Sequence, residues 1–553
     1  MSRAPETDGA PLAEPASEER IVRSAGVVSL AILVSRVSGL VREIVMARLF
    51  GAGQAYDAFL LGFRIPNLTR DLFAEGALSS AFVPTFTHYL STRGRQEAAG
   101  LAHVVATALL LVVGAVCGLG IVFSPQLVGL LAPGFAAVPE KFALAVTLTR
   151  IMFPFLLFVA LAAQAMGMLN ALDRFGVPAM ASTFFNIGSI GFGLVLGFLV
   201  GPWLGFEPIV GMAWGVVLGG VWQWLWQMPS LVRLGIGLRW RLDWSHPGLR
   251  QILQLMGPAL VGSAAVQINV MVNTNLASRV VDPLTGPDGP VSWLGYAFRF
   301  MQLPLGLFGV ALASATLPAI SRSISAGNLE EFRHTVSHSL GMVFLLTVPS
   351  SVGLAVLGEP IIGAIYEGGR FRAYDTQQTA LALSWYALGL AGYAALKVLT
   401  PAFYALGDSR TPMWVSVGSI AVNYVVASTM VNRGWLGHAG LALATSAVAL
   451  FGFLTLFWIL RGRLRGIDGH RLAWSVVRIS AASAVMGQVV DAARAGLEGW
   501  LGVSRMARLL NLAACIPLGV LCFWALCRIA EVPELDSAHR AWRGWLRGGR
   551  ARI

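Results

Sequence analysis

Charged side chains lie inside apolar stretches of this sequence, where each charge costs at least a few kcal/mol in lipid. Arg36 lies about 12 residues after Ser24, which opens the first stretch, and is thus roughly 18 Å along a helix, near mid-membrane. Further charged and polar residues follow in the first, second and eighth stretches: Arg42 and Glu43; Asp57, Arg64, Asn67, Arg70, Asp71 and Glu75; Arg299 and Gln302. Charges gathered in this way face a wet cavity, pair with one another, or do both.

The arginines of these stretches outnumber the acids, and this excess indicates the chemistry of the site. Guanidinium groups hold phosphate oxygens in pairs and stay charged at any working pH. A drug-cation or sodium site would instead need uncompensated carboxylates. The excess therefore predicts a cavity for a phosphate-bearing ligand, and internal salt bridging alone, such as that of Arg36 with Glu43, is the alternative.

The elements that must position these residues are membrane helices. Of the 553 residues, 56% are hydrophobic and 12% are charged, compared with about 25% charged in soluble proteins. Lipid removes the need for a charged surface, because apolar side chains can face outward. Runs of ~20 apolar residues predict an all-α, polytopic membrane protein with about fourteen transmembrane helices. The runs start near Ser24, Tyr56, Leu101, Phe142, Pro178, Pro208, Leu249, Val291, Phe332, Thr376, Pro412, Leu436, Leu472 and Arg505.

Arginine is unevenly distributed between alternate loops, and this sets the expected orientation. The net charge of +12 is spread over many short loops, whereas a nucleic-acid-binding protein would gather it on one face. The loops around Arg93 and Arg461 are more basic than the loop around Asp282, so the positive-inside rule places both termini in the cytoplasm. We expect a disordered cytoplasmic tail at 1–20 and a basic cytoplasmic tail at 531–553.

Two pairs of similar segments indicate an internal duplication. GALSSAFVP ends at Pro84 and VALASATLP at Pro318, while NALDRFGVP ends at Pro178 and YALGDSRTP at Pro412, so that both pairs are 234 residues apart. Common membrane-helix composition is the alternative explanation. A repeat of an even number of helices relates the halves by an axis along the membrane normal, with the substrate site between them. We therefore expect two pseudo-symmetric six-helix lobes, at 21–235 and 248–465, and two further helices at 470–530.

Other polar residues carry weaker signals. Four cysteines lie in apolar runs without zinc or disulfide spacing, so neither a metal nor a cofactor is predicted: Cys117, Cys515, Cys522 and Cys527. Amides in the later helices have no acid beside them to form a cation site, and interhelical hydrogen bonds are their expected role: Gln267, Asn269, Asn273, Asn275 and Asn423. The stretch YEGGRFRAYD at 366–375 is either a short lid or a turn.

Five segments of the sequence resemble the MurJ (MviN) lipid II flippases of the multidrug/oligosaccharidyl-lipid/polysaccharide exporter superfamily. They are SRVSGLVRE at 35–43, FGAGQAYDAF at 50–59, PNLTRDLFAEGALSSAFVP at 66–84, GVALASATLP at 309–318 and KVLTPAFYALGDSRTP at 397–412. The first three together are specific to that family. The resemblance implies two lobes, and it implies that the last two helices, at 470–530, form a groove for a polyprenyl tail.

The resemblance also implies roles for individual residues. The family's substrate-binding arginines fall by position on Arg36, Arg42, Arg70 and Arg299. Asp57, Asn67 and Glu75 match family positions as well, and together with Glu43, Asp71 and Gln302 they are expected to tune the charge of the cavity or to gate it. The family often has acids where this chain has Phe298 and Gln302, so Arg299 is expected to be less neutralised here.

The leading hypothesis is a flippase that moves undecaprenyl-diphosphate-linked peptidoglycan precursor across the bacterial inner membrane by alternating access, with a role in cell-wall biogenesis and cell shape. We expect no enzymatic activity, a monomer, and lipid II, membrane lipids and cell-wall synthesis proteins as partners. An exporter of another polyprenyl-linked oligosaccharide is the first alternative, and a multidrug–cation antiporter is the next. A membrane glycosyltransferase would need acids on a sizeable external loop, and a non-transporting scaffold would leave the cavity arginines dispensable.

Overall fold

The protein is described here by a computed structural model, which covers residues 16–70, 78–237, 239–464, 466 and 469–540. Within these residues the secondary structure is helical, and extended pairing is limited to two isolated bridges, of Asp282 with Gly286 and of Gly368 with Phe371. Helices satisfy their backbone hydrogen bonds internally, which lipid demands of any spanning segment. The all-α fold class predicted from the sequence is confirmed.

Ten helices of the described chain are long and apolar enough to cross a membrane, and a pair bent by 41° would make an eleventh span. Three more of the expected stretches lie in α1 (Ala16–Phe50), α2 (Gln54–Arg70) and α11 (Pro247–Ala277). Arginines, acids and amides lower the hydropathy of these three helices. The multi-pass membrane protein is confirmed, and a count of about fourteen spans is compatible with it.

The helices form two compact units, each of which is described by itself. Unit 1 contains residues 1–43, 69–119 and 151–259, and unit 2 contains residues 44–68, 120–150 and 260–553. Two segments from the early part of the chain, 44–68 and 120–150, therefore have their contacts in unit 2. The two units are defined by contacts between residues, whereas the lobes expected at 21–235 and 248–465 are defined by the sequence repeat. The lobe boundaries therefore stay a prediction.

Unit 1 packs two of its helices backbone against backbone. Its helices are the first part of α1, α3 (Ser79–Thr92), α4 (Gly94–Val122), α7 (Phe155–Ala171), α8 (Gly176–Leu194), η3 (Val195–Val200), α9 (Gly201–Leu204), α10 (Pro208–Arg233) and the start of α11. A side chain at Gly215 of α10 would lie 2.5 Å from the carbonyl oxygen of Ser189 of α8. Small residues allow this close approach in membrane helices. Phe82, Phe86 and Leu169 fill the contact between α3 and α7.

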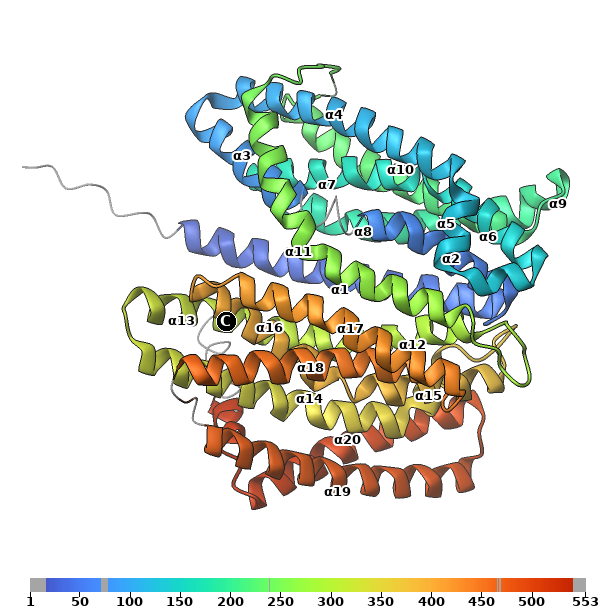
Figure 1. Ribbon diagram of the computed structural model, residues 1–553, viewed down its shortest axis with the longest axis vertical. Helices are drawn as coiled ribbons and strands as arrows, with labels where there is room; N and C mark the ends of the chain where they lie inside the picture. The colour runs from blue at the N-terminus through green and yellow to red at the C-terminus, as the bar shows by residue number, and fades with distance from the viewer. Residues whose placement is uncertain (1–15, 71–77, 238, 465, 467–468, 541–553) are drawn as a thin grey trace, which may run out of the picture. The chain divides into compact units, whose positions relative to one another are not determined.

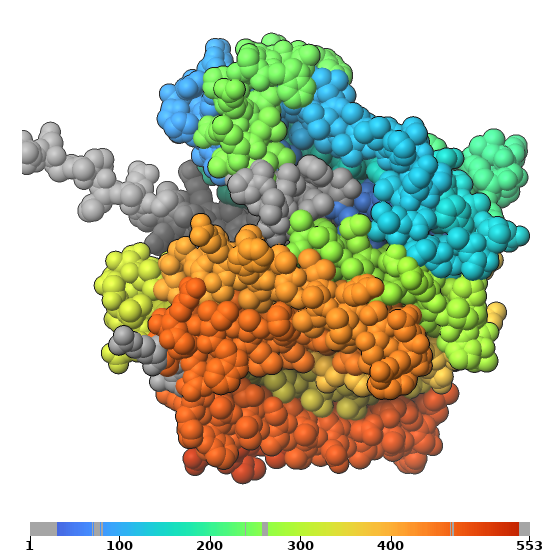
Figure 2. All heavy atoms as spheres, viewed as in Figure 1, coloured from blue at the N-terminus to red at the C-terminus, as the bar shows by residue number. Residues whose placement is uncertain are grey.

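Unit 2 is arranged around one long helix, α14 (Leu329–Ile365). Its other helices are α2, α5 (Ser124–Leu131), η2 (Pro133–Ala137), α6 (Pro139–Met152), the rest of α11, α12 (Pro290–Pro304), η4 (Leu305–Val310), α13 (Ala311–Ser325), α15 (Ala373–Ala387), α16 (Leu390–Ala405), α17 (Arg410–Arg433), α18 (Ala439–Arg463), α19 (Gly469–Leu501) and α20 (Arg505–Ile529). α14 packs against α15, α16, α19 and α20 (Figure 1). In the space-filling view, the orange atoms of α17 and α18 pack together, and the orange-red atoms of α19 lie beyond them (Figure 2).

The last two helices, α19 and α20, pack along each other and on α14 (Figure 1). Large apolar side chains are exposed on both helices, Trp474 and Leu521 among them, as is typical of lipid-facing residues. The tail groove expected at 470–530 stays a prediction. Of the two expected tails, residues 1–15 and 541–553 lie outside the described residues, while residues 16–20 are part of α1 and residues 533–540 are helical.

Candidate functional site

The first two predicted substrate arginines lie on α1 in unit 1, where α1 contacts α8. The side-chain amide of Asn186 on α8 donates to the carbonyl oxygen of Ser35 at 3.3 Å and to the hydroxyl of Ser38 at 3.1 Å. Because both serines are small, α1 approaches α8 closely and still finds a polar partner there. This contact fixes the rotation of α1 and so the directions in which Arg36 and Arg42 point.

Arg36 and Arg42 differ in how far their charges are neutralised. The Arg42 guanidinium lies 5.4 Å from the centre of the Phe185 ring and 3.8 Å from the carboxylate of Glu43, which is buried. The salt bridge that the sequence suggested between Arg36 and Glu43 is therefore formed by Arg42. Arg36 is exposed.

Arg70 is the last residue of α2 and is half-buried. By its contacts it belongs to unit 1. Asp71 and Glu75, which were expected to tune the charge of this region, lie outside the described residues.

Arg299 and Gln302 lie one turn apart on α12 in unit 2, and both are exposed. Phe298 packs edge-on against Tyr386 of α15, with ring centres 5.4 Å apart. Position 298 is thus used for packing and gives Arg299 no carboxylate. Pro304 and the π-helical turn η4 follow, and both weaken the regular hydrogen-bond ladder of the helix.

Arg64 and Asn67 lie one turn apart on α2 in unit 2. The Arg64 Nη1 atom donates to Thr274 Oγ1 of α11 at 2.8 Å. The side-chain oxygen of Asn67 is buried and has no hydrogen-bond partner among the residues that the structure describes. An unpaired buried oxygen costs roughly 1–3 kcal/mol, so a donor supplied by a ligand at Asn67 would be stabilising.

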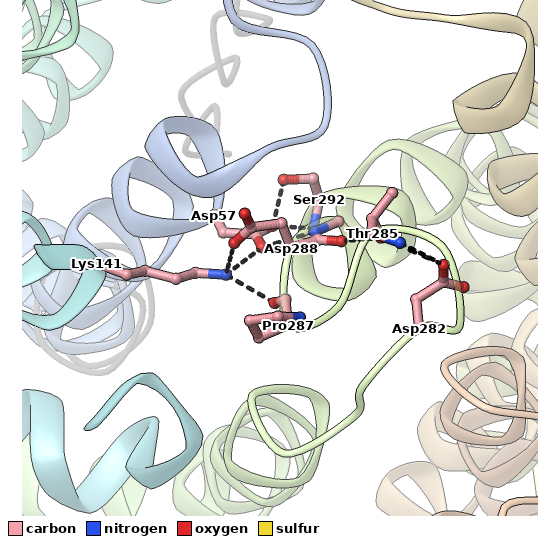
Figure 3. A network of polar contacts seen from close by, with 8 residues as sticks. Asp57, Lys141, Asp282, Thr285, Pro287, Asp288 and Ser292 are labelled. Atoms are coloured by element: carbon pink, nitrogen blue, oxygen red, sulfur yellow. Dashed lines mark hydrogen bonds and ion pairs between the residues drawn. The ribbon is translucent and has the colours of Figure 1, made fainter. Parts of the chain in front are cut away.

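Asp57 lies near the start of α2, is completely buried, and holds the first turn of α12 (Figure 3). Its Oδ1 accepts from the backbone N–H of Ser292 at 2.9 Å and from the Ser292 hydroxyl at 2.5 Å, while its Oδ2 accepts from the N–H of Gly289 at 2.9 Å. The start of a helix has unpaired N–H groups and a partial positive charge, and the carboxylate satisfies both. Asp57 therefore joins α2 to α12 within unit 2, which suits the gating role expected for it.

A lysine that sequence reasoning missed completes this cluster. The Lys141 ammonium on α6 donates to Asp57 Oδ2 at 2.7 Å, to the Pro287 carbonyl at 2.8 Å and to Asp288 Oδ1 at 2.9 Å (Figure 3). The side chains of Lys141 and Asp57 are 0% exposed, and that of Asp288 is 33% exposed. The composition could have drawn attention to Lys141, because Lys141 and Lys397 are the two lysines among 40 basic residues.

The loop that carries Asp288 is itself held in place. Asp282 Oδ1 accepts from the N–H groups of Leu284 at 2.9 Å and Thr285 at 3.1 Å, and from the Tyr374 hydroxyl at 2.9 Å. Burial alone would raise the pKa of Asp282, but these hydrogen bonds to the carboxylate outweigh it and hold the pKa below its ordinary value. The Thr285 hydroxyl donates to the carbonyl oxygen of Asp288 at 2.6 Å, so the loop positions Asp288.

The amide side chains of unit 2 make interhelical hydrogen bonds, as the sequence predicted. Asn269 donates to Ser419, Asn273 donates to Thr445, and Asn423 donates to the backbone of Asn269, all at 3.0–3.2 Å. The four cysteines are free thiols, and three of them are buried. Over the described ranges, no group of three or more His, Cys, Asp or Glu residues is arranged to hold a metal ion.

The stretch 366–375 forms a turn that packs against the end of α1 and leads into α15. The N–H of Arg370 donates to the carbonyl oxygen of Arg48 at 2.9 Å. Gly369 has a φ of +60°, and a side chain there would lie 2.2 Å from the same oxygen. The approach of the turn to α1 therefore requires glycine at this position.

Three comparisons with known proteins agree with one another. The family model described as lipid II flippase MurJ matches residues 46–510. The lipid II flippase MurJ of Burkholderia cenocepacia is 35% identical over 88% of this chain and 93% of its own length. The probable lipid II flippase MurJ of Vibrio cholerae is 35% identical over 94% of this chain and 98% of its own length.

Solved structures give the same result for the fold. A lipid II flippase MurJ in an inward closed conformation is 26% identical, with a TM-score of 0.72 over 91% of this chain and 98% of its own. An inward-facing multidrug resistance MATE family transporter of the MOP superfamily is 16% identical, with a TM-score of 0.61 over 80% of this chain and 95% of its own. The second likeness shows a shared fold alone.

Proposed function

Because this chain belongs to the lipid II flippase MurJ family, we propose that it moves lipid II, the undecaprenyl-diphosphate-linked peptidoglycan precursor, from the inner to the outer leaflet of the cytoplasmic membrane by alternating access. The observation that carries this proposal is the 35% identity to two flippases over most of both chains. Such transport needs a charged cavity and a change of access but no reacting group, so the chain acts without enzymatic chemistry.

Arginines supply the recognition of the substrate in this proposal. The diphosphate and the sugar next to it bind to Arg36, Arg42, Arg70 and Arg299. In support, Arg36 and Arg299 are exposed, and Arg42 lies 3.8 Å from the Glu43 carboxylate and 5.4 Å from the centre of the Phe185 ring. Guanidinium groups bind phosphate oxygens two at a time and remain charged at every working pH, which suits a ligand that carries two phosphates.

The remaining polar residues adjust the net charge of the cavity or control its opening. Glu43 moderates Arg42, Asn67 offers an unpaired oxygen to the headgroup, and Asp57 holds α2 to α12. Asp71, Glu75 and Gln302 act as charge-tuning residues of the same cavity. The polyprenyl tail stays in the bilayer along α19 and α20 while the headgroup crosses.

The cellular setting follows from the same family. The chain is a multi-pass protein of the bacterial inner membrane, with both termini in the cytoplasm because the inner loops are the more basic. It works as a monomer that contacts membrane lipids and cell-wall synthesis proteins. An exporter of another polyprenyl-linked oligosaccharide would use the same diphosphate chemistry, and the identity of the lipid that accumulates on depletion separates the two functions.

The first test is the exposure of lipid II on the outer face of cells depleted of this protein. We expect depletion to abolish exposure, wild-type protein to restore it, and Arg36→Ala to restore less than a tenth of it, because one phosphate contact has been removed. Charge-assisted hydrogen bonds of roughly 1.5–3 kcal/mol correspond to a loss of that size.

Arg433→Ala is the matched control, since Arg433 is also exposed but ends α17. It should restore exposure fully. Unchanged exposure after depletion, in cells without a second flippase, would exclude lipid II as the substrate, and full rescue by Arg36→Ala would exclude the phosphate role of this arginine.

A further inference from the structure

Lys141 is a buried cation with every donor satisfied. An ammonium carries three N–H groups, and Nζ has three acceptors: Asp57 Oδ2 at 2.7 Å, the Pro287 carbonyl at 2.8 Å and Asp288 Oδ1 at 2.9 Å (Figure 3). The centre of the Phe135 ring lies 4.5 Å from Nζ. A compact site with three acceptors fits an ammonium, whereas the planar guanidinium would bring five donors and leave some unpaired.

The acceptors of Lys141 come from separate parts of unit 2. Lys141 lies in α6, Asp57 lies in α2, and Pro287 and Asp288 lie in the loop that leads into α12. Asp57 adds three hydrogen bonds to the first turn of α12. Separating α2 or α6 from α12 would therefore leave a charge in a buried site without its partner, which is strongly unfavourable.

Buried aromatic side chains lie on the same elements as this ion cluster. Tyr56 of α2 stacks on Tyr296 of α12 with ring centres 4.9 Å apart, and Tyr296 contacts Tyr366 at the same distance. Trp293 of α12 is fully buried and donates to Asp375 of α15 at 2.9 Å. Large apolar groups exclude water, and charges interact more strongly in the low dielectric that results.

We propose that Lys141 is the positioning residue that fastens the segments 44–68 and 120–150 to α12, and that its two salt bridges must break whenever this end of unit 2 opens during transport. These segments come from the early part of the chain but have their contacts in unit 2. Lys141 gives both segments a charged link to α12, in addition to uncharged contacts such as the stacking of Tyr56 on Tyr296. The part of this inference that concerns transport rests on the proposed function. The attachment of the two segments to α12 by Lys141 does not, and it is tested without substrate.

Charge, and not the volume of the side chain, is the property that Lys141 contributes. Methionine has a similar length and would fill the same space, but it would leave Asp57 buried with no cation beside it. Asp57→Asn combined with Lys141→Met removes both charges of the pair and keeps one oxygen that can accept from Ser292, although the amide nitrogen cannot accept from Gly289. The double variant is therefore expected to restore part of the contact that Lys141→Met alone breaks.

Hydrogen–deuterium exchange of the full chain, in nanodiscs of phosphatidylethanolamine and phosphatidylglycerol, tests the fastening directly. The N–H groups of Gly289 and Ser292 donate to Asp57, so exchange of the peptide 284–295 reports its opening. We expect exchange of this peptide to be at least tenfold faster in Lys141→Met and in Lys141→Arg than in wild type, and the double variant to exchange more slowly than Lys141→Met. Lys397→Met, which changes the other lysine, should leave this peptide unchanged.

The same peptide gives the results that would overturn the inference. Wild-type exchange in Lys141→Met would show that the charge does not hold the contact, and exchange as fast in the double variant as in Lys141→Met would show that charge balance is not the reason. Exchange in α19 and α20 verifies that each variant is folded. If Lys141→Met cannot be purified, Lys141→Gln replaces it, and exchange equal to wild type in that variant overturns the inference equally.

A transport measurement separates this inference from the proposed function. With wild-type lipid II exposure established, Lys141→Met should lower exposure at least fivefold while lipid II binding to the purified protein stays within twofold of wild type, because Lys141 is not a substrate ligand. Unchanged exposure would overturn the transport step. If wild-type protein itself exposes no lipid II, the proposed function fails, and the exchange data still decide the fastening.

Discussion

At the scale of single residues, the type of cationic side chain, arginine or lysine, matches how far the site is buried. Exposed or half-buried cations on α1, α2 and α12 are arginines, whose planar fork suits a ligand with paired oxygens. The cation buried among three protein oxygens is Lys141, whose compact ammonium uses each donor once. Arginine and lysine are therefore not interchangeable at either kind of site, although both carry one positive charge.

Arg42→Lys tests this distinction at the proposed phosphate site. The variant keeps the positive charge beside Glu43 but loses the planar guanidinium group that can donate two parallel hydrogen bonds. We therefore expect the affinity of the purified protein for lipid II to fall roughly tenfold, which is the effect of losing one charge-assisted hydrogen bond. Binding of radiolabelled lipid II is the measurement. Arg433→Lys is the matched control, and an Arg42→Lys affinity equal to wild type would show that charge alone recognises the ligand.

At the scale of elements, a turn and a helix end are joined by close backbone contact. The turn after α14 donates from Arg370 to the carbonyl oxygen of Arg48 in the last turn of α1. Gly369 makes the approach possible, because any side chain there would collide with the same oxygen. The end of α1 is thus attached to α14 and α15 by main-chain geometry, and Asp57 attaches the following helix to α12 by side-chain chemistry.

Gly369→Ala should lower the thermal stability of the protein. The substitution places a methyl group on a backbone with φ of +60° and into contact with a carbonyl oxygen, so we expect the free energy of unfolding to fall by ~1–3 kcal/mol. Thermal unfolding in nanodiscs is the measurement. Gly53→Ala is the control, because open space surrounds that position and its φ is not positive; equal losses for both variants would contradict the argument.

At the scale of the whole molecule, the contact units do not follow the order of the chain. Residues 44–68 and 120–150 precede the middle of the sequence and yet pack in unit 2. The excess of arginine over acid also belongs to this scale, because it gives the proposed cavity a net positive charge when no substrate is bound.

A net positive cavity should make transport sensitive to membrane potential. A potential that is negative inside draws an empty, positively charged cavity back toward the cytoplasmic side and so resets the transporter. One full charge moved through 100 mV supplies ~2.3 kcal/mol, or up to ~50-fold in rate. Lipid II translocation in proteoliposomes with a potassium-diffusion potential is the measurement, and a rate that is the same at zero and at 100 mV would contradict this coupling.

The sequence by itself determined the class of the protein and its chemical character. Low charge content and long apolar runs indicate a helical membrane protein, because lipid admits only helices and closed barrels, and runs of ~20 apolar residues match a spanning helix, whereas a barrel strand needs only ~9–11 residues. The family and the excess of arginine could also be predicted, since segments such as SRVSGLVRE and the identity of a side chain are local properties. The interhelical role of Asn269, Asn273 and Asn423 followed for the same reason.

Only the tertiary structure decided which residues become partners. No local pattern pairs Lys141 with Asp57, which lies 84 residues away, or with Asp288. It suggested Arg36 as the partner of Glu43, where the structure has Arg42, and it left the stretch 366–375 open between a lid and a turn. Each of these depends on the rotation and packing of helices far apart in the chain, and helical periodicity within one stretch does not contain that information.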